Sequence, residues 1–154
     1  MIDNSFMDKA IALAKKAYKL GEVPVGAVIV NRITNEIISA CHNLVESEHN
    51  PLLHAEILAI NAACKTLKSK NLSDCDLYVS LEPCVMCTAA ISYARIGRLF
   101  YACSDVKQGA VENNTRFFTT SYCFHRPEIY NNLSGEFSAR LIKSFFRKIR
   151  KNEL

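Results

Sequence analysis

The chain has 154 residues, of which 49% are hydrophobic and 22% are charged, the size and composition of one globular domain. Its formal net charge of +4 lies in the segment 133–154, which contains six Lys and Arg residues and only two acids, Glu136 and Glu153. Charges are scattered through the first twenty residues and no later apolar run could span a bilayer, which excludes a signal peptide and a membrane protein. We therefore expect a single cytoplasmic domain over residues 1–154, without membrane contact.

Apolar periodicity and turn residues predict helices that alternate with strands. The predicted helices are 5–21, 50–67, 84–97 and a basic C-terminal helix at about 135–151, and the predicted strands are 23–30, 36–40, 76–81 and 98–103. The helices and strands of residues 104–132 cannot be predicted, because glycine, asparagine and proline interrupt any periodic pattern of apolar residues. The alternation indicates an α/β sandwich with helices on both faces of a sheet, and the continuous apolar run of the first strand indicates burial on both of its faces.

Helix boundaries are predicted from capping residues. Ser5, with Asp8 three residues later, is expected to cap the first helix. The second helix is expected to begin with Asn50 as its cap and Pro51 in its first turn. Gly97 is expected to end the third helix.

Cys84 and Cys87 stand three residues apart, where a predicted strand ends and a helix begins, in the stretch SLEPCVMC (80–87). A C-x-x-C pair at a helix start is typical of a disulfide oxidoreductase, but it also occurs in metal sites. A zinc ribbon would need a second C-x-x-C, which the other cysteines do not supply. Three interpretations remain: a redox pair, a metal site with histidine ligands, or packing of two buried thiols.

The histidines decide between these interpretations. Of the four, only His54 opens a predicted helix with an acid two residues later, in the segment HAE (54–56). Residues i and i+2 of a helix point about 200° apart, so this pair can share a site only just beyond the helix N-terminus. Cys84 and Cys87 lie on one face of the first turn of their own helix. Two helix N-termini that face each other would concentrate positive potential and favour thiolates.

One histidine and two thiolates make three protein ligands, and an open fourth position is the mark of a catalytic zinc site. Zinc would there activate a water molecule. Glu56 is then predicted to carry protons, because ligation by Glu56 would fill the open position. The alternative for Glu56 is a solvated acid, since acids are favoured in a first helical turn for other reasons.

The pattern H-x-E followed by P-C-x-x-C is the signature of zinc-dependent nucleobase deaminases. Other segments extend the match: EVPVGAV (22–28), HAEI (54–57), LEPCVMC (81–87), ARIGRLFYA (94–102), the D-x-K-x-G-A motif (105–110), HRPE (125–128) and FFRKIRK (145–151). Over residues 6–151 the chain therefore resembles the bacterial tRNA-specific adenosine deaminases of the cytidine/deoxycytidylate deaminase superfamily.

This resemblance implies a three-layer α/β/α, cytidine-deaminase-like fold with a mixed central sheet of about five strands. It implies a homodimer with one Zn²⁺ per subunit, and hydrolytic conversion of adenosine to inosine at the wobble position in the anticodon arm of a tRNA. His54, Cys84 and Cys87 match the zinc ligands of the family, and Glu56 matches its proton shuttle.

The resemblance also implies substrate contacts. Asn43 matches a residue that contacts the flipped nucleotide, and Val25 and Leu81 match positions that line the base pocket. By itself, an asparagine after a strand indicates only a turn. Phe124 stands where the family commonly has Asn or His, and Leu52-Leu53 where it often has Thr-Ala. Phe124 is predicted either to stack on a base of a single-stranded loop or to close the core.

The basic C-terminal helix also has two interpretations. Cations opposite an apolar stripe usually form a solvated surface. Clustered cations are equally what polyanion binding requires, and this helix carries the net charge of the chain. We favour tRNA contact through Arg147 and Arg150, with Lys107 and Arg126 of the matching segments as further candidates.

Two rival functions use the same features. A free-base or nucleotide deaminase, acting on guanine, cytosine or a monophosphate, would have the same zinc site without needing the basic helix. A non-enzymatic RNA-binding protein could keep the zinc and lose the acid. The presence of Glu56 argues against the second rival.

Overall fold

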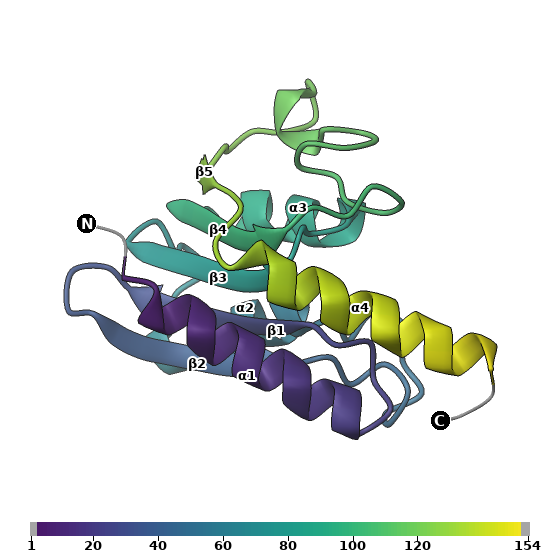
Figure 1. Cartoon of the computed structure of the whole chain (residues 1–154). Coiled ribbons are helices and arrows are strands. Elements are labelled where there is room, and N and C mark those ends of the chain that lie inside the picture. The colour runs from purple at the N-terminus through teal and green to yellow at the C-terminus, as the bar shows by residue number, and fades with distance from the viewer. Residues whose placement is uncertain (1–2, 152–154) are drawn as a thin grey trace.

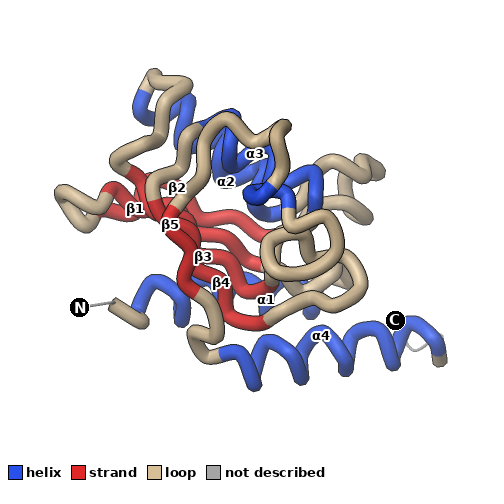
Figure 2. Tube along the Cα trace, turned by 90° about the horizontal axis from the view of Figure 1, so that it is seen from above, coloured by secondary structure: helices blue, strands red, loops and turns tan. Residues whose placement is uncertain are grey.

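The structure, a computed structural model, describes residues 3–151, which form three layers with a sheet in the middle (Figures 1 and 2). The two ends of the expected 1–154 domain lie outside these residues. The helices are α1 (Ser5–Lys19), α2 (Ala55–Leu67), α3 (Val85–Ala94), the short 3-10 helix η1 (Phe117–Thr119) and α4 (Gly135–Arg150). The strands are β1 (Gly26–Asn31), β2 (Glu36–His42), β3 (Cys75–Leu81), β4 (Arg98–Cys103) and β5 (Glu128–Tyr130).

The sheet is mixed, with strand order β2-β1-β3-β4-β5. β1 runs antiparallel to β2 and β3, whereas β3, β4 and β5 run parallel to one another. α2 and α3 cover one face and α1 and α4 the other (Figure 2). The predicted α/β/α architecture is therefore confirmed. The carboxyl end of β3 leads into α3 beside the start of α2. In α/β folds, ligands bind at the end of the sheet where the parallel strands have their carboxyl ends.

β1 is buried on both faces, as its apolar run predicts. Ala27 and Ile29 pack into the core below α2 and α3, while Val28 packs into the core below α1. Gly26 allows α1 to approach closely, since a Cβ atom there would lie 2.0 Å from the carbonyl oxygen of Ala10.

The predicted start of the second helix is wrong. Residues 45–52 form turns and α2 begins at Ala55. The side-chain oxygen of Asn50 accepts a hydrogen bond of 3.0 Å from the Leu52 N–H, so Asn50 closes a local turn instead of capping a helix. His54 consequently occupies the N-cap in an extended conformation (φ −68°, ψ 150°), and its side chain does not cap the helix.

Two other predicted starts also differ from the structure. Ser5 lies inside α1, and its N–H donates to Asp3 Oδ1 at 2.9 Å, so Ser5 is not the cap. β1 begins at Gly26 and not at Val23, because the Val25 N–H donates to the Val23 carbonyl at 2.8 Å in a tight turn.

α3 ends at Ala94, earlier than the predicted stop at Gly97. Arg95 takes up the left-handed conformation (φ 59°), and the Ile96 N–H donates to the Ile91 carbonyl at 3.2 Å. This is a Schellman ending, and the complete burial of Ile91 and Ile96 supplies its apolar contact. Tertiary packing therefore ends the helix without glycine.

The segment 104–132 contains a long loop (104–116), η1 and β5, a strand too short to give a period in the sequence. α4 then runs alongside α1 on the same face of the sheet (Figure 1). Tyr18 of α1 and Phe145 of α4 join the two helices, with ring centroids 5.8 Å apart. Among residues 3–151, no helix combines the length and the hydropathy needed to cross a membrane.

Candidate active site

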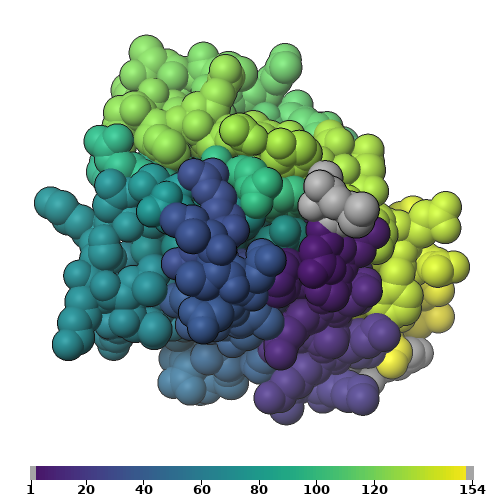
Figure 3. Space-filling model, turned by 90° about the vertical axis from the view of Figure 1, so that its left-hand side faces the viewer, coloured from purple at the N-terminus to yellow at the C-terminus, as the bar shows by residue number. Residues whose placement is uncertain are grey.

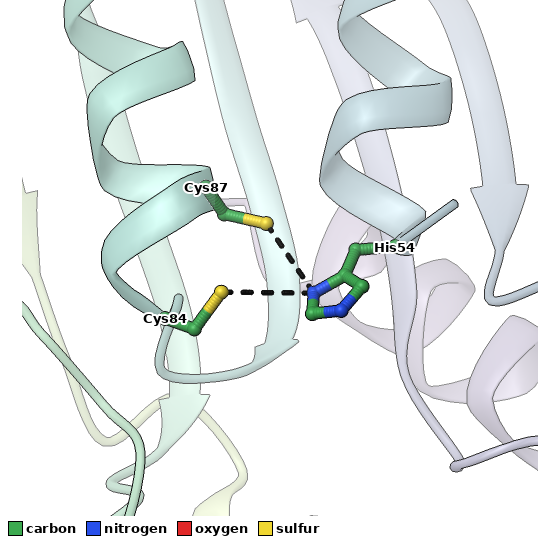
Figure 4. A group of neighbouring side chains, drawn as sticks. All are labelled: His54, Cys84 and Cys87. Carbon is green, nitrogen blue, oxygen red and sulfur yellow. Dashed lines mark hydrogen bonds between the residues drawn. The ribbon is translucent and has the colours of Figure 1, made fainter. Parts of the chain in front are cut away.

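One histidine and two cysteines meet where α2 and α3 begin (Figure 4). His54 Nδ1 lies 3.6 Å from Cys84 Sγ and 3.6 Å from Cys87 Sγ. His54 and Cys84 are the N-cap residues of their helices, and neither side chain caps its own helix. Both side chains are therefore free to face each other, and the structure brings together the three residues predicted to bind metal.

The spacing and chemistry of these donors fit zinc. Tetrahedral zinc, with bonds of about 2.3 Å to sulfur and about 2.0 Å to nitrogen, separates the two kinds of ligand atom by about 3.5 Å. The observed separation is 3.6 Å, and all three ligand atoms lie within 4.8 Å of one another. One nitrogen and two sulfurs form a soft donor set that suits zinc and leaves a fourth position for another ligand.

The electrostatics of the cluster favour a thiolate. A hydrogen bond from Cys87 lowers the pKa of Cys84 to about 4, and the hydrogen bond with His54 acts in the same direction. The hydrogen bond with Cys84 in turn raises the pKa of His54. The N-termini of α2 and α3 add positive potential. The cluster thus includes the Cys84 thiolate, and the thiolate is the form in which cysteine binds a metal.

Glu56 lies in the first turn of α2 and is only 4% exposed. Burial raises its pKa to about 7, and the charge of nearby Cys84 acts in the same direction. A carboxyl group with a pKa near neutrality can both accept and release a proton. The alternative of a solvated acid is wrong, because water has almost no access to this side chain.

The cluster opens into a cavity of about 930 Å³. The predicted site residues that line it are His54, Glu56, Cys84, Asn43, Val25, Leu81, Lys107, Arg147 and Arg150. Cys87 is completely buried behind them, and Phe124 and Arg126 do not line the cavity. The opposite end of the molecule, seen in Figure 3, shows the turn between β1 and β2 (blue) beside the start of α1 (purple). The three residues predicted to bind metal thus gather at one end of the sheet with Asn43, Val25 and Leu81, whereas Phe124 does not.

Comparisons with known proteins agree with this geometry. The family model of the cytidine and deoxycytidylate deaminase zinc-binding region matches residues 1–103. The tRNA-specific adenosine deaminase of Rickettsia typhi is 55% identical over 144 residues, which cover 94% of this chain and 97% of that relative. The chain belongs to the tRNA-specific adenosine deaminase family.

Solved structures agree with this assignment to the tRNA-specific adenosine deaminases. A structure from studies of A-to-I editing by tRNA:A34 deaminases at the wobble position of transfer RNA matches with a TM-score of 0.87 at 42% identity. The match covers 90% of this chain and 99% of that one. Guanine deaminase from Nitrosomonas europaea has the same fold, with a TM-score of 0.81 at 21% identity over 94% of this chain and 84% of that one. The predicted cytidine-deaminase-like fold is confirmed.

In this member of the tRNA-specific adenosine deaminase family, Asn43 is more than a turn residue. Its side-chain oxygen accepts a hydrogen bond of 2.8 Å from the Ala55 N–H, and so provides the cap that His54 does not. Because this oxygen is engaged, the Asn43 Nδ2 group is left to donate to a ligand in the cavity. The sequence alone did not indicate the contact, since Asn43 and Ala55 belong to different elements.

Phe124 lies at the opposite end of α3 from Cys84. It is 55% exposed, so the prediction that it closes the core is wrong. Its ring packs edge-on against Tyr93, with centroids 5.0 Å apart, and lies 5.9 Å from the guanidinium of Arg95. Contacts of Phe124 and of the exposed Arg126 with RNA remain predictions, and they would be made outside the cavity.

Sequence reasoning missed Glu22, a buried acid that lines the cavity. Glu22 accepts hydrogen bonds from the N–H groups of Glu46 and Ser47 at 2.9 and 2.8 Å. Burial opposes its ionisation, but these hydrogen bonds lower its pKa. The only signal was the matching segment EVPVGAV, because an acid between a helix and a strand otherwise indicates exposure.

Proposed function

We propose that this protein is a zinc-dependent enzyme that converts adenosine to inosine at the wobble position of a tRNA anticodon. The observation that carries the proposal is the meeting of His54, Cys84 and Cys87 beside buried Glu56 at a cavity. His54, Cys84 and Cys87 would hold the zinc, and no carboxylate is needed as a fourth ligand. When bound, zinc supplies a Lewis acid that lowers the pKa of a water molecule.

The reaction needs a proton carrier, and the burial of Glu56 and its pKa of about 7 support this role for it. Water adds to C6 of adenine, the amino group leaves as ammonia, and the oxygen stays as the carbonyl of inosine. Glu56 accepts a proton from the attacking water and supplies protons to N1 and to the leaving amino group. Its burial excludes bulk water from these transfers.

Three cavity residues are proposed to hold the base. Asn43 would donate a hydrogen bond from Nδ2, because its oxygen already caps α2. Val25 and Leu81 supply apolar surface on the cavity wall for a planar ring.

The cavity rim is proposed to bind the RNA strand. Lys107, Lys143, Arg147 and Arg150 line the cavity together with Phe146 and Ile149 of α4. Cations beside apolar side chains are what single-stranded nucleic acid requires, since the cations bind the backbone and the apolar surfaces contact bases. Lys143 was not among the predicted contacts.

The family resemblance supports three further proposals. The first is that the chain acts as a single domain with one zinc per subunit. The second is that it forms a homodimer. The third is that it acts in the cytoplasm, on the anticodon arm of its tRNA.

The function is tested by incubating the zinc-loaded protein with tRNA, an anticodon stem-loop, guanine and cytidine, followed by nucleoside mass spectrometry. We expect inosine in both RNAs, and none in a matched stem-loop with guanosine at the wobble position. Deamination of guanine or cytidine without inosine in either RNA would overturn the proposal. Cys84→Ser, measured by zinc analysis and by the same assay, should lose both zinc and activity.

A further inference from the structure

Glu82 follows the carboxyl end of β3 and is a third buried acid at the cavity, after Glu56 and Glu22, with only 2% of its surface exposed. Its carboxylate accepts five hydrogen bonds, all from the loop 104–116. Oε1 accepts from the Asp105 N–H at 3.1 Å and from Asn113 Nδ2 at 2.7 Å. Oε2 accepts from the N–H groups of Val111, Glu112 and Asn113 at 3.1, 3.2 and 3.3 Å. One side chain thus holds both ends of a segment that has no regular secondary structure.

The loop 104–116 forms one wall of the cavity. The cavity-lining residues that it contributes are Ser104, Asp105, Val106, Lys107 and Gln108. The loop also meets the chain that carries the first metal-binding cysteine: the Ala110 N–H donates to the Pro83 carbonyl at 2.9 Å, and Gly109 forms a β-bridge with Cys84. Because Glu82 comes directly before Pro83 and Cys84 in the chain, it joins this wall to the cluster of His54, Cys84 and Cys87.

The loop fits tightly around the carboxylate. A Cβ atom added at Gly109 would lie 2.3 Å from Glu82 Oε2 and 2.4 Å from the Asp105 carbonyl oxygen. The five hydrogen bonds require that both side-chain oxygens of residue 82 act as acceptors. A glutamine there would turn one acceptor into an NH₂ group that faces backbone N–H donors.

We propose that Glu82 is a positioning residue that holds the loop 104–116 in place as a preformed wall for the substrate RNA. The inference rests on the proposed function. The loop reaches the cavity but supplies neither a metal ligand nor the proton carrier, so its order governs substrate binding and not the chemical step. Preordering a binding surface before the ligand arrives removes an entropic cost of binding.

The test compares Glu82→Gln with Asp76→Asn. Asp76 is also 2% exposed and pairs with Arg98 at the other end of β3, away from the cavity, so it is the matched control for the loss of a buried charge. For an anticodon stem-loop, Glu82→Gln should raise KM by about 10-fold or more and change kcat by less than about 3-fold. Zinc content should stay unchanged, and hydrogen exchange should accelerate in the loop 104–116. Asp76→Asn should leave KM and loop exchange unchanged.

Asn113→Ala is the milder variant should Glu82→Gln fail to fold. It removes the side-chain donor and keeps the four backbone donors, so KM should rise by about 3-fold, with faster exchange confined to the loop. Unchanged loop exchange in Glu82→Gln, or a loss of kcat with unchanged KM, would overturn the inference. Hydrogen exchange needs no turnover, so it tests Glu82 even if the wild-type protein does not form inosine.

Discussion

Glu56 and Glu82 are both buried next to the metal cluster, yet their surroundings differ. Glu82 accepts five hydrogen bonds from one loop, and its carboxylate is the centre around which that loop folds. Burial raises the pKa of Glu56 to about 7, as expected for an acid without a comparable set of donors. The comparison teaches that burial alone does not identify a catalytic acid. The hydrogen-bond donors around each carboxylate distinguish the acid proposed to carry protons from the acid proposed to anchor the loop.

The comparison is tested most strongly by Glu56→Gln. The amide keeps the shape of the side chain but cannot carry a proton, so kcat for inosine formation should fall by about 10³-fold or more. Zinc content should stay at the wild-type level. Inosine formation at close to the wild-type rate would remove Glu56 from its assigned role.

Glu56→Gln should have the larger loss of activity, whereas Glu82→Gln should have the larger loss of stability. Glu82→Gln leaves backbone N–H groups without acceptors and should lower the free energy of unfolding by about 3 kcal/mol. Glu56→Gln replaces a poorly solvated carboxyl by a neutral amide and should change it by less than about 1 kcal/mol. Urea denaturation of the zinc-loaded proteins measures both values. Equal losses would show that the two acids are anchored alike.

Glu22 extends the comparison to acidic pH. Its folded-state pKa is lowered from 4.5, so ionised Glu22 stabilises the fold above that pH, and the contribution is lost as pH falls through the lower folded-state pKa. Glu22→Gln should lower the free energy of unfolding by about 1–2 kcal/mol at neutral pH. This difference from wild type should shrink below about pH 4.5, as urea denaturation across pH would show. A difference that is independent of pH would contradict the role of the charge.

The smallest effect is expected at the exposed rim, where cations and not buried acids face the cavity. Arg147→Ala combined with Arg150→Ala should weaken tRNA binding and reduce the slope of log K against log salt by about one unit or more. Arg140→Ala combined with Lys151→Ala is the matched control, because it removes the same charge from exposed residues in α4 and just after it that do not line the cavity. Identical salt slopes for the two double variants would assign the effect to net charge alone.

The layered fold and the residues of the metal cluster could be predicted because their signals are local. The spacings of His54 with Glu56, and of Cys84 with Cys87, indicate a chemistry before any fold is known. The start of α2 could not be predicted, because Asn50 and Pro51 form a convincing local cap. The cap that operates comes from Asn43, across a turn-rich segment.

The anchoring acids could not be predicted for a related reason. Glu22 and Glu82 bind backbone N–H groups of segments distant in the sequence, and a backbone donor gives no residue-type signal. In the sequence, Glu82 is only the residue between Leu81 and Pro83 of a metal-binding motif. The tertiary arrangement alone shows that the loop 104–116 wraps around it.

Asn43 has one observed role, as the cap of α2, and one proposed role, as a contact of the nucleotide, and this combination limits how such a site can diversify. A substitution there would alter the proposed contact with the nucleotide and, at the same time, uncap the helix that presents His54 and Glu56. Val25 and Leu81 line the same cavity through apolar side chains alone, so their size can change without that penalty. New base preferences in descendants or engineered variants of this protein should therefore accumulate at the two apolar positions, with the asparagine kept.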